Sequence, residues 1–359
     1  MADSKQAPLD AAAAAKAAFA SVQDKPFPND IFTAPELRWA VIGCGVIANQ
    51  MAQSLALAGR KLAGVANRTL SKAQTFAEQY GIEKVYDTVE DLYADPDIDA
   101  VYITTPHNTH ITYLRAALAA GKHVLCEKAI TLNSAELDEA RAIADEHNVV
   151  LMDATTVFHM PLYQELRRHM DAGDFGRMNL AQLNFGSYKE YGDLTNRFYN
   201  RSLAGGAMLD IGVYALSVMR LFMASQPIEV VSLGNTCETG VDVAGGIVCR
   251  NAEQQLGVVS LTLHSKQPKR SIISFDKCYI EVNEYPRADH ATIVWTADGH
   301  REEVHAGTEA YALCYEMADL EKAVAGDDSK RELLDYASDV MELMTKLRAD
   351  WGVVYPEEE

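Results

Sequence analysis

The sequence predicts an α/β protein with two domains: an N-terminal doubly wound parallel sheet, then an α+β domain with an open, mostly antiparallel sheet. Between residues 37 and 154, short apolar runs alternate with amphipathic segments, which is the pattern of βαβ units with strands buried on both faces. After Pro227, successive apolar runs are separated only by turns, which indicates antiparallel strands. A chain of 359 residues is long enough for two such cores.

Periodicity places the elements of the first domain, about six strands in all. Strands are predicted at 37–43, 61–67, 99–106, 122–128 and 149–154, and helices at 49–59, 71–81, 109–121 and 134–148. Gly81 is expected to close the second of these helices.

The second half of the chain has a different order of predicted elements. We expect a helix at 161–172, a strand at 177–187, a long apolar segment at 205–223, strands at 228–235, 245–250, 256–265, 270–276, 278–284 and 291–297, and closing helices at 309–326 and 330–352. The predicted division is an extension over 1–36, helical within 9–22, a first domain over 37–154 and a second over 155–359, whose last helix is expected to pack back on the first domain.

Composition excludes several classes of function. The net charge of -19, without a cluster of Lys and Arg, argues against nucleic acid as a partner. No apolar run reaches the roughly 20 residues of a membrane span, so no membrane partner is expected. The six cysteines show no C-x-x-C pairing, which favours neither a zinc site nor a disulfide framework and suits a reducing cytoplasm.

The sharpest motif is G-x-G-x-x-A, formed by Gly43, Gly45 and Ala48 between a predicted strand and a helix. In dinucleotide-binding (Rossmann) folds the first glycine makes the tight turn, the second lets the backbone approach a pyrophosphate, and the small third residue permits close packing. Val46 and Ile47 then stand where free N–H groups of the helix would meet the phosphates. The alternative is a glycine turn without a ligand.

The end of the second predicted strand carries Asn67 and Arg68, where NAD-specific folds place an acidic residue on the ribose 2′-hydroxyl. A guanidinium suits a 2′-phosphate better than a hydroxyl, so NADP is favoured over NAD. The alternative is an Arg68 that lies in solvent or stacks on the adenine.

Three further motifs carry a resemblance: "CEK" at 126–128, "TPHNTH" at 105–110 and "GGAMLDIGVY" at 205–214. Together they resemble the glucose-fructose oxidoreductase, inositol dehydrogenase and rhizopine catabolism family (Gfo/Idh/MocA), and within it the branch that contains dimeric dihydrodiol dehydrogenase. The resemblance covers roughly residues 37 to 355. It implies a Rossmann domain, an open-sheet domain, and hydride transfer between a nicotinamide and a sugar-like or diol substrate in the cleft between them.

Lys128, Asp210 and Tyr214 are the candidate catalytic residues. Tyr214 is four residues after Asp210, so on a helix the two share a face. A nearby lysine would lower the pKa of the tyrosine and suit it to acid–base catalysis, and Asp210 would orient the lysine or a substrate hydroxyl. The resemblance places the catalytic lysine and tyrosine at Lys128 and Tyr214. The alternatives are a surface ion pair of Glu127 with Lys128 and a tyrosine packed in the core.

The segment "TPHNTH" is expected to line the nicotinamide side of the cofactor. Its candidate cofactor contacts, with those of "CEK", are Thr105, Pro106, His107, Asn108, His110, Glu127 and Lys128. Asn108 or Thr109 is expected to cap the next helix. For His107 and His110, a cap or packing role is favoured over a catalytic or metal role, and no metal site is predicted because no ligand spacing occurs.

Substrate contacts are predicted from position. Thr156 stands where the dihydrodiol branch carries a tryptophan, and a smaller, more polar wall favours a sugar or polyol over an aromatic diol. His159 either faces this pocket or is packed. Arg197, Tyr199 and Asn200 precede the Asp210 motif and are candidates to bind substrate hydroxyls.

The residue after Lys128 departs from the family pattern. Most relatives have proline there, whereas this chain has Ala129. Because non-proline peptide bonds are almost always trans, the Lys128–Ala129 bond is predicted to be trans.

The sequence therefore predicts a cytoplasmic NAD(P)-dependent oxidoreductase, a homodimer or homotetramer through the open sheet, that acts on a hydroxyl or carbonyl of a sugar, polyol or diol. Two alternatives remain at this level. One is a dinucleotide-binding regulator without catalysis, and the other is a sugar–sugar oxidoreductase that holds its cofactor tightly.

Overall fold

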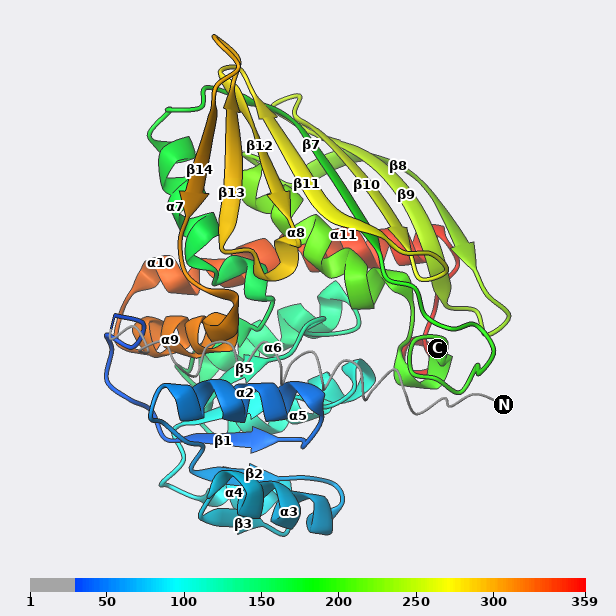
Figure 1. Cartoon of the computed structure of the whole chain (residues 1–359). Helices are drawn as coiled ribbons and strands as arrows, with labels where there is room; N and C mark the ends of the chain where they lie inside the picture. The colour runs from blue at the N-terminus through cyan, green and yellow to red at the C-terminus, as the bar shows by residue number, and fades with distance from the viewer. Residues whose placement is uncertain (1–29) are drawn as a thin grey trace.

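A six-stranded parallel sheet with helices on both faces makes up the first part of residues 30–359, which the computed structural model describes (Figure 1). The strand order is β3-β2-β1-β4-β5-β6, so the chain reverses its direction of winding between β1 and β4. The elements are β1 Trp39–Ile42, α2 Val46–Leu57, β2 Gly64–Ala66, α3 Leu70–Tyr80, β3 Lys84–Tyr86, α4 Val89–Ala94, β4 Ala100–Ile103, α5 His110–Ala119, β5 His123–Cys126, α6 Ser134–Glu146 and β6 Leu151–Asp153.

These elements follow from the local sequence. The residues of β1 and β4 are all buried, as near-continuous apolar runs require in a two-sided parallel sheet. Helix α3 ends at Gly81, which adopts φ +66° as a left-handed C-cap, so that prediction is confirmed. The short β3 and α4 were not assigned to residues from the sequence, because three and six residues are too few to show a period. The helix predicted within 9–22 lies outside the described residues.

The second sheet has eight strands in the order β14-β13-β12-β11-β7-β10-β9-β8. The β7–β10 pair is parallel and the other six pairs are antiparallel, so a mostly antiparallel sheet is confirmed. The strands are β7 Met178–Gly186, β8 Pro227–Thr236, β9 Asp242–Asn251, β10 Leu256–Thr262, β11 Gln267–Phe275, β12 Cys278–Asn283, β13 His290–Trp295 and β14 Arg301–His305.

Helices fill the space between the two sheets (Figure 1). They are α7 Pro161–Asp171, a π-helical turn at Met208–Gly212, α8 Val213–Phe222, α9 Ala312–Val324, α10 Asp328–Arg331 and α11 Leu333–Asp350. Helix α8 packs against β7 on the inner face of the second sheet. The segment Arg201–Phe222 is long and apolar enough to cross a membrane, but 83% of its apolar window is buried inside the protein, as in a core helix.

The last helices pack against the first domain. Helix α9 contacts α2, and its buried Glu321 accepts hydrogen bonds from Trp39 Nε1 at 3.0 Å and from Arg60 at 2.6 Å. Helix α11 contacts α6 and β6, and Arg348 on it donates to the carbonyl of Leu132. The chain therefore returns to the parallel sheet at its end, which holds the two sheets in a defined relation.

Candidate active site

The carboxyl ends of three neighbouring strands bring the predicted motifs together. Strand β4 lies between β1 and β5 in the sheet, and all three run parallel. Gly43 follows β1, Thr105 follows β4, and Glu127 and Lys128 follow β5. Ligands of doubly wound sheets bind at this edge, beside the point where the winding reverses.

The glycine loop leaves room for a phosphate group. Gly43 has φ +103°, and a Cβ there would lie 2.6 Å from Thr104 Oγ1, so this turn requires glycine. Gly45 is the N-cap of α2, with no side-chain cap, and a Cβ added there would have no atom within 4 Å. Ala48 is fully buried against the sheet. The free N–H groups of α2 thus face open space, which fits a pyrophosphate.

Two hydrophobic residues and the end of β2 complete this side. Val46 at the start of α2 is 58% exposed, and Ile47 is partly buried. Asn67 follows β2 and donates from Nδ2 to the carbonyl of Thr69 at 3.0 Å. Arg68 is exposed, and its guanidinium has no ion pair or hydrogen bond to any residue in the described part of the chain. Its charge is therefore available to a ligand.

Lys128, Asp210 and Tyr214 form one cluster, with the two latter residues contributed by the second domain. Lys128 Nζ donates to the backbone carbonyl of Asp210 at 2.7 Å and lies 3.5 Å from Asp210 Oδ1. The same ammonium lies 4.8 Å from the centre of the Tyr214 ring, in a cation–π contact. Asp210 lies on a π-helical turn, not on the regular helix assumed from the spacing, and Tyr214 is the second residue of α8. Such turns occur frequently at functional sites.

The charges of this cluster depend on one another. Burial opposes ionisation of Asp210, but Lys128, Arg197 and Lys189 together hold its pKa below the usual range. Burial lowers the pKa of Lys128, but Tyr214 and Asp210 offset this effect and leave it raised. Lysine and aspartate are therefore both charged.

For Tyr214, burial is the largest effect and raises the pKa of the phenol, against an opposing effect of Lys128 and Arg287. The predicted direction of the lysine's contribution is therefore confirmed. The prediction of a lowered pKa is wrong for the protein alone, because burial outweighs the nearby cations. The hydroxyl keeps its proton at neutral pH.

Glu127 restrains the backbone at Lys128. It is buried, accepts a hydrogen bond from Tyr102 Oη, and accepts another at 3.3 Å from the backbone N–H of Lys128. It binds a backbone donor and does not form a surface pair with the ammonium. The predicted trans bond after Lys128 is wrong, because the Lys128–Ala129 peptide is cis. The prediction rested on local preference alone, whereas Ala129 is fully buried and its carbonyl lies 3.0 Å from His110 Nδ1.

His110 is a structural residue of this edge. It is fully buried, with Nδ1 at 3.0 Å from the carbonyl of Ala129 and Nε2 at 2.8 Å from that of Thr105, so it ties the loops after β4 and β5 together. His107 Nδ1 lies 3.4 Å from the carbonyl of Ala204, and burial lowers the pKa of this ring to about 3. No group of metal-ligating side chains occurs within residues 30–359.

The other residues of this loop bond to backbone and to the second domain. Pro106 is exposed at the start of a short 3-10 turn. Asn108 Nδ2 donates to Glu357 Oε1 at 2.7 Å, and Thr109 Oγ1 donates to the carbonyl of Pro106 at 2.7 Å. The N-cap of α5 is Thr109, without a side-chain cap bond, so the predicted capping by Asn108 or Thr109 is wrong. Their side chains find nearer partners than the helix N–H groups.

Four of the five predicted substrate residues are engaged elsewhere. Thr156 is 2% exposed and donates to Glu316 at 2.7 Å. His159 is 1% exposed, between the carbonyl of Asp153 at 2.8 Å and Asp319 at 3.1 Å, which is the packed alternative.

The remaining three come from the loop after β7. Tyr199 is fully buried and donates to the carbonyl of Lys189, and Asn200 accepts from the N–H of Ser202. Arg197 joins the cluster, since its Nη2 lies 3.2 Å from Asp210 Oδ1.

Sequence reasoning missed residues that act here across long separations. Arg287 donates to Gln50 on α2 at 3.3 Å, and Lys189 influences the charge of Asp210. Neither residue belongs to a motif, so no local signal could have found them.

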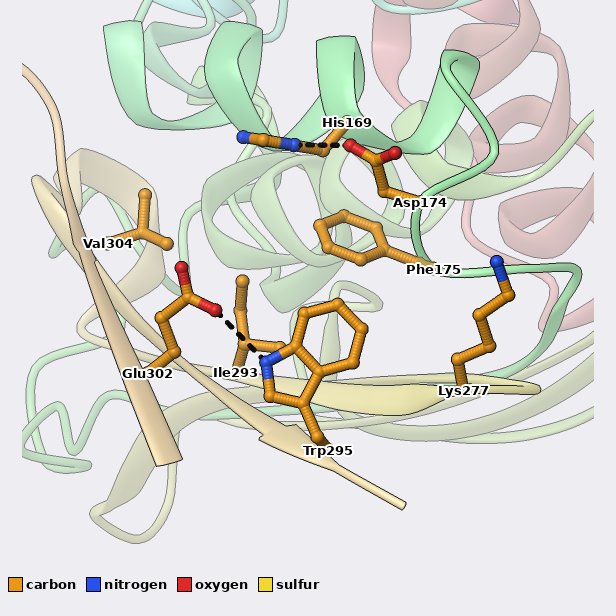
Figure 2. Close-up of a pocket in the computed structure, with 8 residues that line it drawn as sticks. All are labelled: His169, Asp174, Phe175, Lys277, Ile293, Trp295, Glu302 and Val304. Atoms are coloured by element: carbon orange, nitrogen blue, oxygen red, sulfur yellow. Dashed lines mark hydrogen bonds and ion pairs between the residues drawn. The ribbon is translucent and has the colours of Figure 1, made fainter. Parts of the chain in front are cut away.

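A surface hollow of about 320 Å³ lies apart from these residues, between the end of α7, the turn before β12, and strands β13 and β14 (Figure 2). Its lining residues are His169, Asp174, Phe175, Lys277, Ile293, Trp295, Glu302 and Val304. None of them is a predicted site residue.

Comparison with known proteins identifies both domains. Residues 37–155 match the profile of the GFO/IDH/MocA oxidoreductase family, NAD-binding Rossmann fold, and residues 163–281 match the GFO/IDH/MocA C-terminal domain. Trans-1,2-dihydrobenzene-1,2-diol dehydrogenase from Mus musculus is 32% identical over 69% of this chain and 75% of its own length. The enzyme of that name from Sus scrofa is 28% identical over 90% and 99%.

Solved structures share the fold. An aldose-aldose oxidoreductase from Caulobacter crescentus, complexed with glycerol, superposes with a TM-score of 0.78 at 21% identity, over 88% of this chain and 98% of its own. A 3-ketoreductase from Actinomadura kijaniata, in complex with NADP and TDP-benzene, superposes with 0.75 at 24% identity, over 88% and 98%. Levoglucosan dehydrogenase, with NADH and levoglucosan, gives 0.76 at 20% identity, over 87% and 97%.

Proposed function

Because the chain belongs to the Gfo/Idh/MocA family of NAD(P)-binding oxidoreductases, we propose that Lys128, Asp210 and Tyr214 catalyse hydride transfer at a hydroxyl or carbonyl carbon of a sugar, polyol or diol. One observation carries the proposal. An ammonium held at 2.7 Å by the backbone of Asp210 lies against the ring of a protonated tyrosine, next to the edge where a nicotinamide would bind.

Tyr214 is the acid and base of the proposed reaction. A nicotinamide held at this edge would supply the hydride for reduction of a carbonyl carbon or take it up in oxidation of an alcohol carbon. In reduction, Tyr214 gives its phenolic proton to the oxygen that becomes the hydroxyl. In oxidation, the phenolate takes the proton from the alcohol, and Lys128 stabilises both the phenolate and the developing alkoxide.

Asp210 positions the lysine. Its backbone carbonyl and its carboxylate both face Lys128 Nζ, which leaves the ammonium few alternative positions. On the other side, Glu127 restrains the backbone of the same lysine. The lysine side chain is only 14% exposed, so little water competes for its charge.

The residues at the strand ends fit a dinucleotide. Gly43 and Gly45, with Val46 and Ile47 at the start of α2, would hold the pyrophosphate, and Thr105 to His110 with Glu127 would face the nicotinamide side. Arg68 is free at the end of β2, which supports a 2′-phosphate and therefore NADP. The levoglucosan dehydrogenase structure contains NADH and the 3-ketoreductase structure contains NADP, so the family uses both.

A sugar or polyol is the proposed substrate class. The names of the relatives span a dihydrodiol, levoglucosan and aldoses, which share vicinal oxygens on a small carbon frame. A cytoplasmic location stays a prediction.

We further propose a homo-oligomer through the outer face of the second sheet. Val231 and Leu233 on the edge strand β8 are 76% and 83% exposed, and Val248, which pairs with Val231 across the strands, is 47% exposed. Contiguous exposed apolar side chains of this kind are typical of interfaces.

Tyr214→Phe tests the mechanism. We expect kcat for the best sugar or polyol to fall by about 10²- to 10⁴-fold, which is the usual contribution of acid–base catalysis. The Kd for the cofactor, measured by fluorescence titration, should stay unchanged. Because Tyr214 is protonated at neutral pH, wild-type alcohol oxidation should speed up as the pH rises.

Other outcomes would support the alternatives. Near-normal turnover of Tyr214→Phe would remove the tyrosine from the mechanism. Cofactor binding without turnover of any sugar, polyol or diol would favour a regulator. A protein that purifies with a bound nicotinamide, and reduces one sugar while oxidising another, would favour the sugar–sugar oxidoreductase.

A further inference from the structure

The cluster around Tyr214 contains more positive charge than its carboxylate can balance. Asp210 faces Lys128 at 3.5 Å and Arg197 at 3.2 Å, and Lys189 also acts on its charge. Three cations therefore share the single carboxylate of Asp210. The chain as a whole has a net charge of -19, so this local excess of positive charge is opposite in sign to the charge of the protein.

Two of these cations contact the same aromatic ring. Lys189 Nζ and Arg197 Cζ are each 4.1 Å from the centre of the Phe198 ring. Both belong to the loop that follows β7, whose Phe185 has its ring 6.1 Å from that of Tyr214. The pair therefore belongs to the second domain, as do Asp210 and Tyr214, and Arg197 contacts Asp210 directly.

Lys189 has no partner of opposite charge. Among residues 30–359, no carboxylate lies within ion-pair distance of its ammonium, although the side chain is half-buried. Burial, together with the nearby Arg197 and Lys128, lowers the pKa of Lys189, while Asp210 opposes this effect. A half-buried lysine without a counter-ion is costly unless a ligand supplies one.

We propose that the substrate is an anionic sugar derivative, whose carboxylate or phosphate binds to Lys189 and Arg197 while a hydroxyl carbon faces Tyr214. The inference rests on the proposed function for the position of the reacting carbon. It deepens that function by naming the substrate class. The charged group would be bound in place, and its distance from Tyr214 would select which hydroxyl reacts.

Binding in the Tyr214→Phe variant tests this proposal without relying on turnover. With saturating NADP, gluconate is titrated against its neutral counterpart sorbitol, and glucose 6-phosphate against glucose. We expect at least one anion to bind at least about tenfold tighter than its neutral partner, because charge-assisted hydrogen bonds are roughly twice as strong as neutral ones. The two pairs distinguish a carboxylate from a phosphate. The preference should weaken as salt is added.

Substitutions locate the anion. Lys189→Met and Arg197→Gln should each reduce the anion-to-neutral affinity ratio by about tenfold. Arg197 is 59% exposed, so its variant is expected to fold even where Lys189→Met does not. Lys277→Met, which removes one charge at the distant hollow, is the matched control and should leave the ratio unchanged (Figure 2).

Two results would overturn the proposal. One is a set of anions that bind no tighter than their neutral partners. The other is an equal effect of Lys189→Met and Lys277→Met on the ratio. Failure of the proposed function would be seen separately, as normal turnover by Tyr214→Phe.

Discussion

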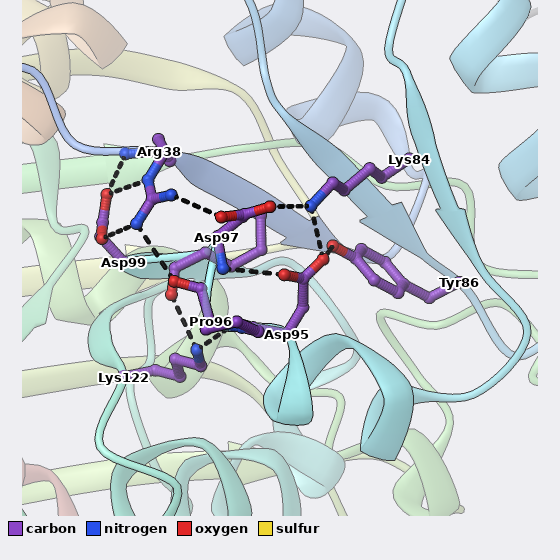
Figure 3. Close-up of polar contacts among 9 residues, drawn as sticks. Arg38, Lys84, Tyr86, Asp95, Pro96, Asp97, Asp99 and Lys122 are labelled. Carbon is purple, nitrogen blue, oxygen red and sulfur yellow. Dashed lines mark hydrogen bonds and ion pairs between the residues drawn. The ribbon is translucent and has the colours of Figure 1, made fainter.

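The two edges of the parallel sheet differ in how their positively charged side chains are paired. At the amino edge, the cations that precede the strands are matched with acceptors: Arg38 bonds to Asp99 at 2.8 Å and Asp97 at 3.0 Å, and Lys84 bonds to Asp95 at 2.7 Å (Figure 3).

Further hydrogen-bond donors at this edge also have acceptors. Lys122, just before β5, donates to the carbonyls of Asp95 and Ile98, both at 2.7 Å. Tyr86 Oη donates to Asp95 at 2.7 Å. The pKa of Asp95 is therefore held below its usual range, chiefly by the hydrogen bonds from Lys84 and Tyr86. The cations named at this edge are therefore all bound by acceptors of the protein itself.

At the carboxyl edge the cations are not all matched. Arg68 has no partner among the described residues, and Lys128 shares Asp210 with Arg197. We infer from this comparison that paired strand-end charges stabilise the fold and that the charges in excess are available to a ligand. Substitutions at the two edges should therefore affect different measurements.

The largest effect is expected for Lys128→Met. We expect kcat to fall by about 10²- to 10³-fold, as when one electrostatic donor to a developing oxyanion is removed. Lys84→Met at the amino edge is the matched control, and it should leave kcat unchanged while lowering Tm slightly. Steady-state kinetics and thermal unfolding measure the two variants together. An equal loss of kcat in both variants would contradict the proposed difference between the two edges.

Arg68→Ala should weaken NADP binding and leave NAD binding nearly unchanged. A charged hydrogen bond is worth about 1.5–3 kcal/mol, so the Kd for NADP should rise by about 10- to 100-fold. Lys61→Ala is the control, because Lys61 is already paired with Glu83 at 2.7 Å. Fluorescence titration with both cofactors measures the ratio, and an equal loss for NADP and NAD would contradict a 2′-phosphate site at Arg68.

Substitution of the two loop glycines should affect different properties: stability at Gly43 and cofactor binding at Gly45. Gly43→Ala forces a side chain to φ +103° and against Thr104, so unfolding should cost about 1–3 kcal/mol less. Gly45→Ala meets no protein atom within 4 Å, so the fold should tolerate it while the methyl group occupies the phosphate space. Urea unfolding and cofactor titration test this, and a Gly45→Ala variant with normal cofactor affinity would show that the pyrophosphate lies elsewhere.

The smallest effect is expected at Asp95. Its pKa is lowered in the folded state, so its contribution to stability is present above the unfolded pKa of about 3.9 and is lost as the pH falls further. Asp95→Asn should lower Tm slightly at pH 7, and its difference from wild type should shrink as the pH falls from 5 through 3. Turnover should not change. A difference that grows on acidification would mean that Asp95 is not stabilised as a carboxylate.

Much of the site could be predicted because it lies at strand ends. Gly43, Thr105 and Lys128 each end a run whose period is local, and parallel strands bring their carboxyl ends to one edge whatever the loops do. The motif around Asp210 and Tyr214 could be assigned a role through resemblance. Its meeting with Lys128, 82 residues earlier, was expected and is observed.

The tertiary structure decided the rest, because burial and long-range partners have no local pattern. Tyr214 is a protonated phenol since the packed domains remove water from around it, which outweighs the nearby lysine. His159 is a core residue since Asp319, 160 residues later, packs on it. Sequence alone determined which residues end the strands and which of them are candidates for the chemistry. Their ionisation and their partners were set by how the two domains dock, because electrostatic energies depend on burial and distance in space and not on separation along the chain.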